Sequence, residues 1–181
     1  RMRWLLPASA ALIVGALLLW FTIGRTPPAT AADSIAVLPF VDMSAGKDQE
    51  FFADGISEEL LNLLAKVPQL RVIARTSSFS FKGKDVDIAE IARKLNVANV
   101  LEGSVRKSGG RVRITAQLVD GATSDNVWAE RYDRDLNDIF ALQDEISEAI
   151  VSALKLKLLP EEKKAIEQRG TDNVEAYNLY L

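Results

Sequence analysis

Hydrophobic and polar positions divide the chain into an apolar amino-terminal stretch and a longer region of alternating and helical patterns. Residues 34–40 form a short apolar run, which is typical of a buried strand. Residues 55–67 place apolar side chains three and four positions apart, and Pro68 follows, so they predict an amphipathic helix. Asp54 or Ser57 is expected to cap its amino terminus. The folded region is therefore predicted to begin with a strand and a helix.

The later part of the chain changes from helical spacing to strict alternation. In residues 111–120 every second side chain is apolar, which predicts a strand with one packed face and one wet face. The glycines of Ser108-Gly109-Gly110 predict a tight hairpin turn before it. The other expected elements are a strand at 70–74, a helix from Asp87 to Leu95, strands at 97–107 and 127–134, and a long helix from 139 to 158.

The expected order of elements over residues 34–158 is βαβαβββα. It alternates first and then meanders, so it predicts an α/β fold in which helices pack on a mixed sheet. This stretch is long enough for one domain with a hydrophobic core.

Residues 4–23 are apolar and uncharged. A helix of that length spans about 30 Å, the thickness of a bilayer core. Arg1 and Arg3 precede the run and only Arg25 closely follows it, which favours a cytoplasmic amino terminus and a periplasmic location after about residue 24. The sequence therefore predicts a single-pass anchor in a bacterial inner membrane.

A cleaved signal peptide is the alternative interpretation of the amino terminus, because Ala29-Thr30-Ala31 has the form of a cleavage site. The apolar run is longer than a usual signal core, and the candidate site lies beyond Arg25, so the anchor is favoured. Residues 1–3 are then a cytoplasmic flank and 24–33 a linker. The chain starts at Arg1 and ends within a helical pattern at 171–181, so we expect it to be the middle of a longer protein.

Composition excludes several kinds of chemistry. The chain has no cysteine and no histidine, so it cannot by itself form a disulfide, a zinc-thiolate site or a Ser-His-Asp triad. Its net charge is -3, and three of its arginines lie in the first 25 residues. The part predicted to be exported is therefore more acidic than the whole chain, and it is not expected to bind nucleic acid. We expect no enzymatic activity, no cofactor and no metal for the residues present.

Two sets of residues resemble catalytic or metal-binding patterns. Ser44-Ala45-Gly46-Lys47 and Ser124-Asp125-Asn126 match the S-x-x-K and S-D-N elements of penicillin-interacting enzymes, but no Lys-Thr-Gly follows, so we interpret both as turns. The acidic clusters at 85–87 and 133–138 precede predicted helices, where carboxylates stabilise the amino-terminal dipole.

A possible interaction surface lies on the last strands. Trp128 and Tyr132 fall on the same side of one predicted strand, where they either pack in the core, the favoured interpretation, or stand exposed. Arg111 and Arg113 follow the hairpin turn and could add positive charge to such a surface.

Several segments together resemble the TolB amino-terminal-like, or FlgO-like, module of membrane-anchored bacterial proteins. The matching stretches include residues 34–40 (SIAVLPF), 52–55 (FADG), 72–79 (VIARTSSF), 100–106 (VLEGSVR), 111–118 (RVRITAQL), 128–134 (WAERYDR) and 138–146 (DIFALQDEI). Residues 173–181 resemble the first helix of a tetratricopeptide array, so 159–181 is expected to be a linker and the start of that array.

The resemblance implies a non-catalytic sensory or docking module with a protein partner in the periplasm. Family members place an output domain before the membrane helix, either a winged-helix DNA-binding domain or a class III nucleotide cyclase. The winged-helix type is favoured here, with the cyclase and a periplasmic scaffold without an output domain as alternatives. The oligomeric state stays open.

Overall fold

The computed structural model describes residues 33–156 and 160–167. The predicted flank (1–3), membrane helix (4–23) and nearly all of the linker (24–33) lie outside the described residues, as does the expected tetratricopeptide helix at 171–181. None of the helices in the described part has the length and apolarity that crossing a membrane requires. All described residues belong to one compact unit.

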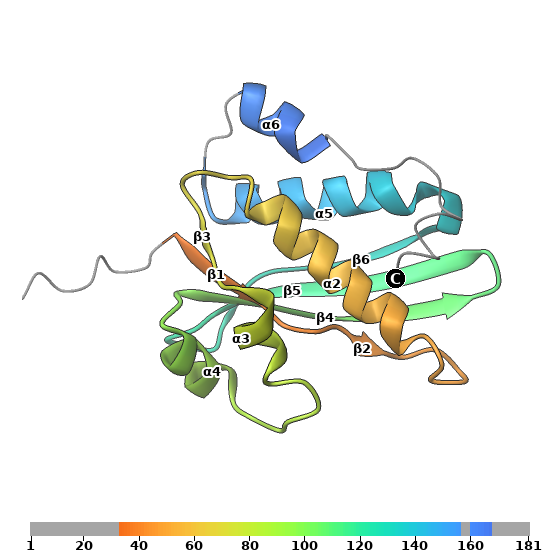
Figure 1. The fold of residues 1–181 in the computed structure, drawn as a ribbon, viewed down its shortest axis with the longest axis horizontal. Coiled ribbons are helices and arrows are strands. Elements are labelled where there is room, and N and C mark those ends of the chain that lie inside the picture. The colour runs from red at the N-terminus through yellow and green to blue at the C-terminus, as the bar shows by residue number, and fades with distance from the viewer. Residues whose placement is uncertain (1–32, 157–159, 168–181) are drawn as a thin grey trace, which may run out of the picture. The chain divides into compact units, whose positions relative to one another are not determined.

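The described chain alternates strands and helices first and then forms a three-strand meander (Figure 1). The elements are β1 (Ser34–Val37), β2 (Val41–Asp42), α2 (Glu50–Leu64), β3 (Arg71–Val72), α3 (Arg75–Phe79), α4 (Ile88–Leu95), β4 (Asn99–Ser108), β5 (Arg111–Asp120), β6 (Asn126–Asp135), the 3-10 turn η1 (Leu136–Asp138), α5 (Ile139–Ala153) and α6 (Pro160–Glu167).

The strands form one six-stranded mixed sheet in the order β3-β1-β4-β5-β6, with β2 paired to β4 beyond the end of β1. β1 runs parallel to β3 and β4, β2 runs parallel to β4, and β5 is antiparallel to both β4 and β6. Gly109 adopts a φ of +58° in the β4–β5 turn, the left-handed conformation that glycine tolerates best. The mixed α/β fold and this hairpin were correctly predicted.

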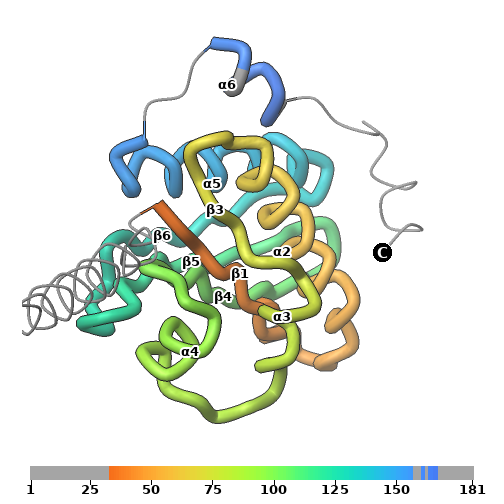
Figure 2. The backbone as a smooth tube through the Cα atoms, turned by 60° about the vertical axis from the view of Figure 1, so that its left-hand side comes forward, coloured from red at the N-terminus to blue at the C-terminus, as the bar shows by residue number. Residues whose placement is uncertain are grey.

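Helices cover the two faces of the sheet unequally (Figure 2). On one face, α2 and α5 bury the larger core, in which Leu60 and Ile146 lie among strand residues such as Ile114 and Leu118. On the other face, α4 covers only the end of the sheet near Val100, where Ile91 packs. Beyond α4, the residues of β4 and β5 that point to this second face are polar, and we call this part of the sheet the open face.

The predicted first helix begins earlier than expected. α2 starts at Glu50, and its N-cap residue is Gln49 rather than Asp54 or Ser57. Both expected caps lie inside the helix, and Ser57 is fully buried. The capping prediction was therefore wrong, because the buried residues Phe52 and Ala53 extend the apolar face of the helix before residue 55.

The other differences concern short elements. The strand predicted at 70–74 contains only Arg71–Val72, and α5 ends at Ala153 rather than near residue 158, because Lys155 adopts a left-handed φ of 57°. β2, α3 and α6 were not predicted. α6 is largely polar, but its Ile166 is fully buried in the larger core, and Lys66 donates a hydrogen bond of 2.9 Å to the carbonyl of Ala165.

The expected start of the second helix is confirmed. Asp87 is the N-cap of α4, and its carboxylate accepts a hydrogen bond of 2.8 Å from the N–H of Ala89. At the other end Asn96 has a φ of 52°, which closes the helix in the left-handed conformation.

Candidate functional site

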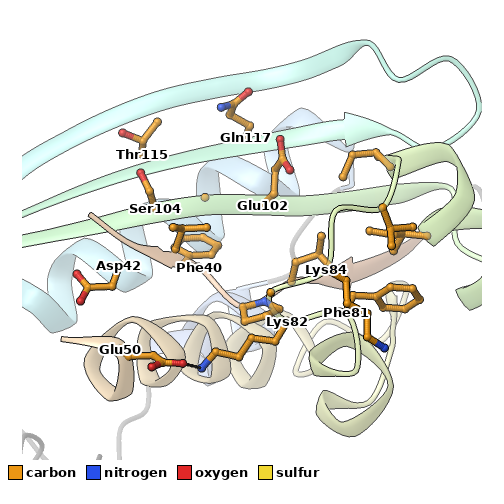
Figure 3. Close-up of a pocket in the computed structure, with 18 of the residues that line it drawn as sticks. Phe40, Asp42, Glu50, Phe81, Lys82, Lys84, Glu102, Ser104, Thr115 and Gln117 are labelled. Carbon is orange, nitrogen blue, oxygen red and sulfur yellow. Dashed lines mark ion pairs between the residues drawn. The ribbon is translucent and has the colours of Figure 1, made fainter. Parts of the chain in front are cut away.

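The open face of the sheet forms the floor of a pocket of about 640 Å³. This volume is in the range of ligand-binding sites. Figure 3 shows Glu102, Ser104, Thr115 and Gln117 on the strand side and Lys82 on the opposite side. The apolar lining comes from Leu38, Pro39, Phe40, Val41, Phe81, Val86, Ile88 and Ile91.

Alternation along β4 and β5 gives the floor its polar character. Glu102 pairs with Gln117, and Ser104 pairs with Thr115, so all four side chains project from the same face. Their neighbours on β5, Ile114 and Ala116, are buried on the face that α2 and α5 cover. The pocket floor is thus the wet face that the sequence pattern predicted for residues 111–120.

One wall is the segment that follows β1. Its backbone stays beside β4, since the N–H of Leu38 donates to the carbonyl of Leu101 at 2.9 Å and the N–H of Met43 donates to that of Val105 at 2.7 Å. The ring of Phe40 belongs to the larger core and lies over Gly103 on the face that α2 and α5 cover, where an added Cβ would be 2.8 Å from the ring and 2.4 Å from the carbonyl oxygen of Thr115. Only a residue without a side chain leaves room for this ring, which anchors the wall segment from the core side.

The opposite wall is tied to α2 by charge. Lys82 forms ion pairs with Glu50, at 2.7 Å, and with Asp54 (Figure 3 shows the first of these pairs). Partial burial acts to lower the pKa of Lys82, but hydrogen bonds and charge from Asp54 and Glu50 outweigh it and raise that pKa. The ammonium group is therefore charged and held, and it fixes the start of the connection between α3 and α4.

The loop after β2 is ordered by another carboxylate. Asp42 accepts hydrogen bonds of 2.8 Å from the N–H groups of Ser44 and Gln49. Burial acts to raise the pKa of Asp42, but these hydrogen bonds outweigh it and lower that pKa. Asp42 thus supports the rim of the pocket.

Two buried side-chain oxygens, one on α2 and one on α3, have no hydrogen-bond partner among the described residues. They are Oδ1 of Asp54, whose other oxygen bonds Lys82, and Oγ of Ser78 in α3. Buried polar atoms without partners are uncommon and point to a bound water or ligand atom.

The residues of the predicted interaction surface are divided between the two faces of the sheet. Tyr132 pairs with Ile114 and is buried, and Trp128 pairs with Leu118 and packs against the larger core. This confirms the favoured core interpretation of the two aromatic residues. Arg111 and Arg113 lie on the other face, where both are exposed.

The two arginines share one carboxylate. Arg111 and Arg113 each contact Asp133 on the neighbouring strand at 2.6 Å, through different oxygens. Hydrogen bonds from Arg113 and Arg111 lower the pKa of Asp133 to about 2. Asp133 thus acts as a cross-strand partner and not as a helix cap, which was the prediction for its cluster.

The segments that resemble penicillin-interacting enzymes lie at opposite ends of β4. The hydroxyl of Ser44 accepts a hydrogen bond of 3.0 Å from the N–H of Lys107, whereas Ser124 donates its N–H to the carbonyl of Asp120, in the turn before β6. Lys47 and Ser124 both have positive φ angles, which confirms their interpretation as turns. Within residues 33–156 and 160–167, no three His, Cys, Asp or Glu side chains are grouped to hold a metal ion.

The pocket itself was not predicted from the sequence. Its walls come from the 38–42 and 81–88 segments, whose contacts with the sheet depend on the two-residue strand β2 and on α3. The signal that could have indicated it is the pair of lysines around Gly83 in a loop. Gly103 in an otherwise regular strand indicates a close approach of another group, which is Phe40 on the opposite face of the sheet.

Comparison with known proteins assigns the domain. Residues 31–149 match the family model described as the HilA/YgeH-like transcriptional regulator, second domain. The chain belongs to this family. The matched range includes the whole sheet, helices α2 to α4, most of α5 and every residue that lines the pocket.

A curated relative of this chain is named as an enzyme rather than as a transcriptional regulator. The chain is 53% identical over 166 residues to "Putative adenylate cyclase 3" of Rhizobium meliloti (strain 1021). The match includes 87% of this chain but only 28% of that protein. This chain thus spans little more than a quarter of the relative's length.

Solved structures show the same fold at low identity. TolB from Acinetobacter baumannii matches 70% of this chain, and 30% of its own, with 17% identity and a TM-score of 0.51. The LpoB C-terminal domain from Salmonella enterica matches 64% of this chain and 91% of its own, with 17% identity and a TM-score of 0.47. The match to TolB confirms the TolB-like part of the predicted resemblance as a fold.

Proposed function

We propose that this chain is the non-catalytic sensory module of a membrane-anchored bacterial signalling protein, exported beyond residue 24, and that its open-face pocket receives a side chain of a protein partner. The supporting observation is the position of exposed apolar side chains at the rim. Val41 lines the pocket and is 58% exposed, and Phe51, which follows the pocket residue Glu50 in the sequence of α2, is 78% exposed. Exposed apolar groups around a concave site are typical of protein-binding surfaces.

The chemistry of the pocket fits such a partner. Its apolar walls can bury a hydrophobic side chain, and the floor offers hydroxyl, amide and carboxylate groups for hydrogen bonds to a backbone. Lys84 and Glu102 add opposite charges on the two sides. We place no catalytic step in this site.

We propose a nucleotide cyclase as the output domain of the whole protein, because the relative that is 53% identical bears a cyclase name. A DNA-binding output domain of the winged-helix type is the second candidate, supported by the regulator family to which the domain belongs. The FlgO-like module and the tetratricopeptide array, which are also proposed, are compatible with either output domain. Expression of the complete reading frame, with assays for cyclic AMP formation and for DNA binding, distinguishes the two outputs.

Site-specific photo-crosslinking in the native host tests the partner proposal. A photo-reactive amino acid at Met43 or Phe51 is expected to form an adduct, and the same group at exposed Arg93 on α4 is not. Val41→Glu should reduce the adduct at Phe51 by about tenfold or more. Equal adducts at all three positions, or none at the rim, would contradict the proposal.

The proposed export has a separate test. A reporter enzyme that is active only outside the cytoplasm is fused after Leu158 and is expected to be active, because the three arginines around residues 4–23 favour this orientation. An inactive reporter on a stable fusion would rule out export.

A further inference from the structure

β6 forms an open edge of the sheet. It pairs with β5 on one side and with no other strand of the described residues. The edge is ten residues long, and Glu130, Arg131 and Arg134 are exposed along it. An open edge of this length is a template for pairing with another strand.

The hydrogen bonds of the sheet show which backbone groups point outward. The N–H of Leu136 donates to the carbonyl of Gly110 at 2.7 Å, and residues 111–117 continue in the same register with 135–129. In an antiparallel ladder, hydrogen-bonded and non-hydrogen-bonded pairs alternate. Residues 130, 132 and 134 therefore bond to β5, and Ala129, Arg131, Asp133 and Asp135 direct their N–H and C=O groups away from the sheet.

We propose that two copies of this chain dimerise by antiparallel pairing of their β6 strands, with the two-fold axis at Tyr132. In this register the outward-facing residues pair with one another: Arg131 lies opposite Asp133 of the second copy, and Ala129 lies opposite Asp135. Each such pair exchanges two backbone hydrogen bonds. Both copies keep their helices on the same side of one continuous sheet.

Charge selects this register. Arg131 faces Asp133 of the second copy on the open side, and Glu130 faces Arg134 on the helical side, and the symmetry repeats both pairs. A shift of the axis by one residue places Arg131 opposite Arg131 of the second copy, or Asp133 opposite Asp133. The second shift also pairs Arg131 with Asp135, but both shifts lose the pair between Glu130 and Arg134. Like charges directly opposite each other destabilise a strand pair, so both neighbouring registers are disfavoured.

The charged groups on this edge are partly engaged within their own chain, since Asp133 contacts two arginines and Glu130 accepts a hydrogen bond of 2.5 Å from the Tyr132 hydroxyl. Arg131 is exposed, and the described residues give it no ion pair within the chain. Arg134 contacts Glu145 of α5 at 3.2 Å, which holds its guanidinium beside the edge. Charges on an edge strand usually discourage pairing, but here opposite signs meet across the axis.

Disulfide trapping tests the register directly, because the chain has no cysteine of its own. The full 181-residue chain is prepared in mild detergent as two variants, Glu130→Cys and Arg134→Cys. In the proposed dimer, residue 130 faces residue 134 of the second copy at a Cα distance of about 4.5 Å, which a disulfide can bridge. Identical residues of the two copies are about 14 Å apart.

A mixture of the two variants is therefore expected to form a disulfide dimer under mild oxidation, and neither variant alone is. No dimer in the mixture, or equal dimer in the single-variant samples, would overturn the register. This readout is independent of any association through the apolar amino-terminal segment and of the proposed partner.

Charge reversal provides a second measurement. Arg131→Glu faces Asp133 of the second copy and should raise the dimer dissociation constant about tenfold in sedimentation experiments. Arg93→Glu on α4 makes the same change of charge away from the edge and should leave it unchanged. Equal effects of both variants, or a wild-type chain that stays monomeric at every concentration, would overturn the proposal.

Discussion

The hydroxyl of Ser57 accepts a hydrogen bond of 2.8 Å from the backbone N–H of Phe40, although the two residues are 17 positions apart. The same hydroxyl donates to the carbonyl of Ala53 at 2.9 Å, so it is fixed in direction. Both residues are buried, and Phe40 lines the pocket. One serine inside a helix therefore holds the backbone of the segment that leads from β1 into the pocket wall.

Replacing Ser57 with alanine should destabilise the domain by about 1–3 kcal/mol, because the buried N–H of Phe40 loses its partner. The measurement is urea-induced unfolding of the 181-residue chain, followed by circular dichroism. Ser147→Ala is the matched control. Ser147 is equally buried in α5 and donates to the carbonyl of Gln143 at 2.9 Å, but the described residues donate no hydrogen bond to it. Equal losses in the two variants would contradict this role of Ser57.

The role of Ser57 also shows where sequence patterns were sufficient and where they were not. Alternation in β5 and the glycines after Ser108 predicted the hairpin correctly, because local patterns determine both. Ser57 was predicted to be a helix cap, since a serine near a helix start usually has that role. Its real partner, Phe40, is distant in sequence, and no local pattern indicates such a contact.

The same reasoning applies to the pocket and to the predicted interaction surface. Period-two alternation assigns Arg113 and Tyr132 to faces only after the register between β5 and β6 is known. That register places them on opposite faces of the sheet. The pocket depends on β2, which has only two residues and whose position beside β4 is set by tertiary packing rather than by strand propensity.

Gly103 is expected to tolerate no side chain. A methyl group there would lie 2.4 Å from the carbonyl oxygen of Thr115 and 2.8 Å from the ring of Phe40, so the strand and the packing of Phe40 in the larger core would both have to change. We expect Gly103→Ala to destabilise the domain by about 1–3 kcal/mol in the same unfolding experiment.

Gly110→Ala is the control for this substitution. Gly110 has no atom within 4 Å of an added methyl group and does not have a left-handed φ, so the change should stay within about 0.5 kcal/mol. Similar stabilities for the two variants would show that Phe40 does not pack tightly on the strand.

The carboxylate of Asp133 should make part of the stability depend on acidity. Hydrogen bonds from Arg113 and Arg111 lower its pKa from the ordinary value of 3.8 to about 2. The unfolded chain therefore takes up the proton first, and the stabilisation is complete above about pH 4 and is lost as the pH falls towards 2. Asp133→Asn should accordingly be less stable than the wild type at pH 7, and the difference in urea midpoint should shrink over that acidic range. Other carboxylates titrate in both proteins and cancel in this comparison. The contradicting result is a difference in urea midpoint that stays constant from pH 7 to the acid limit. It would show that the pKa of Asp133 is the same in the folded and the unfolded chain.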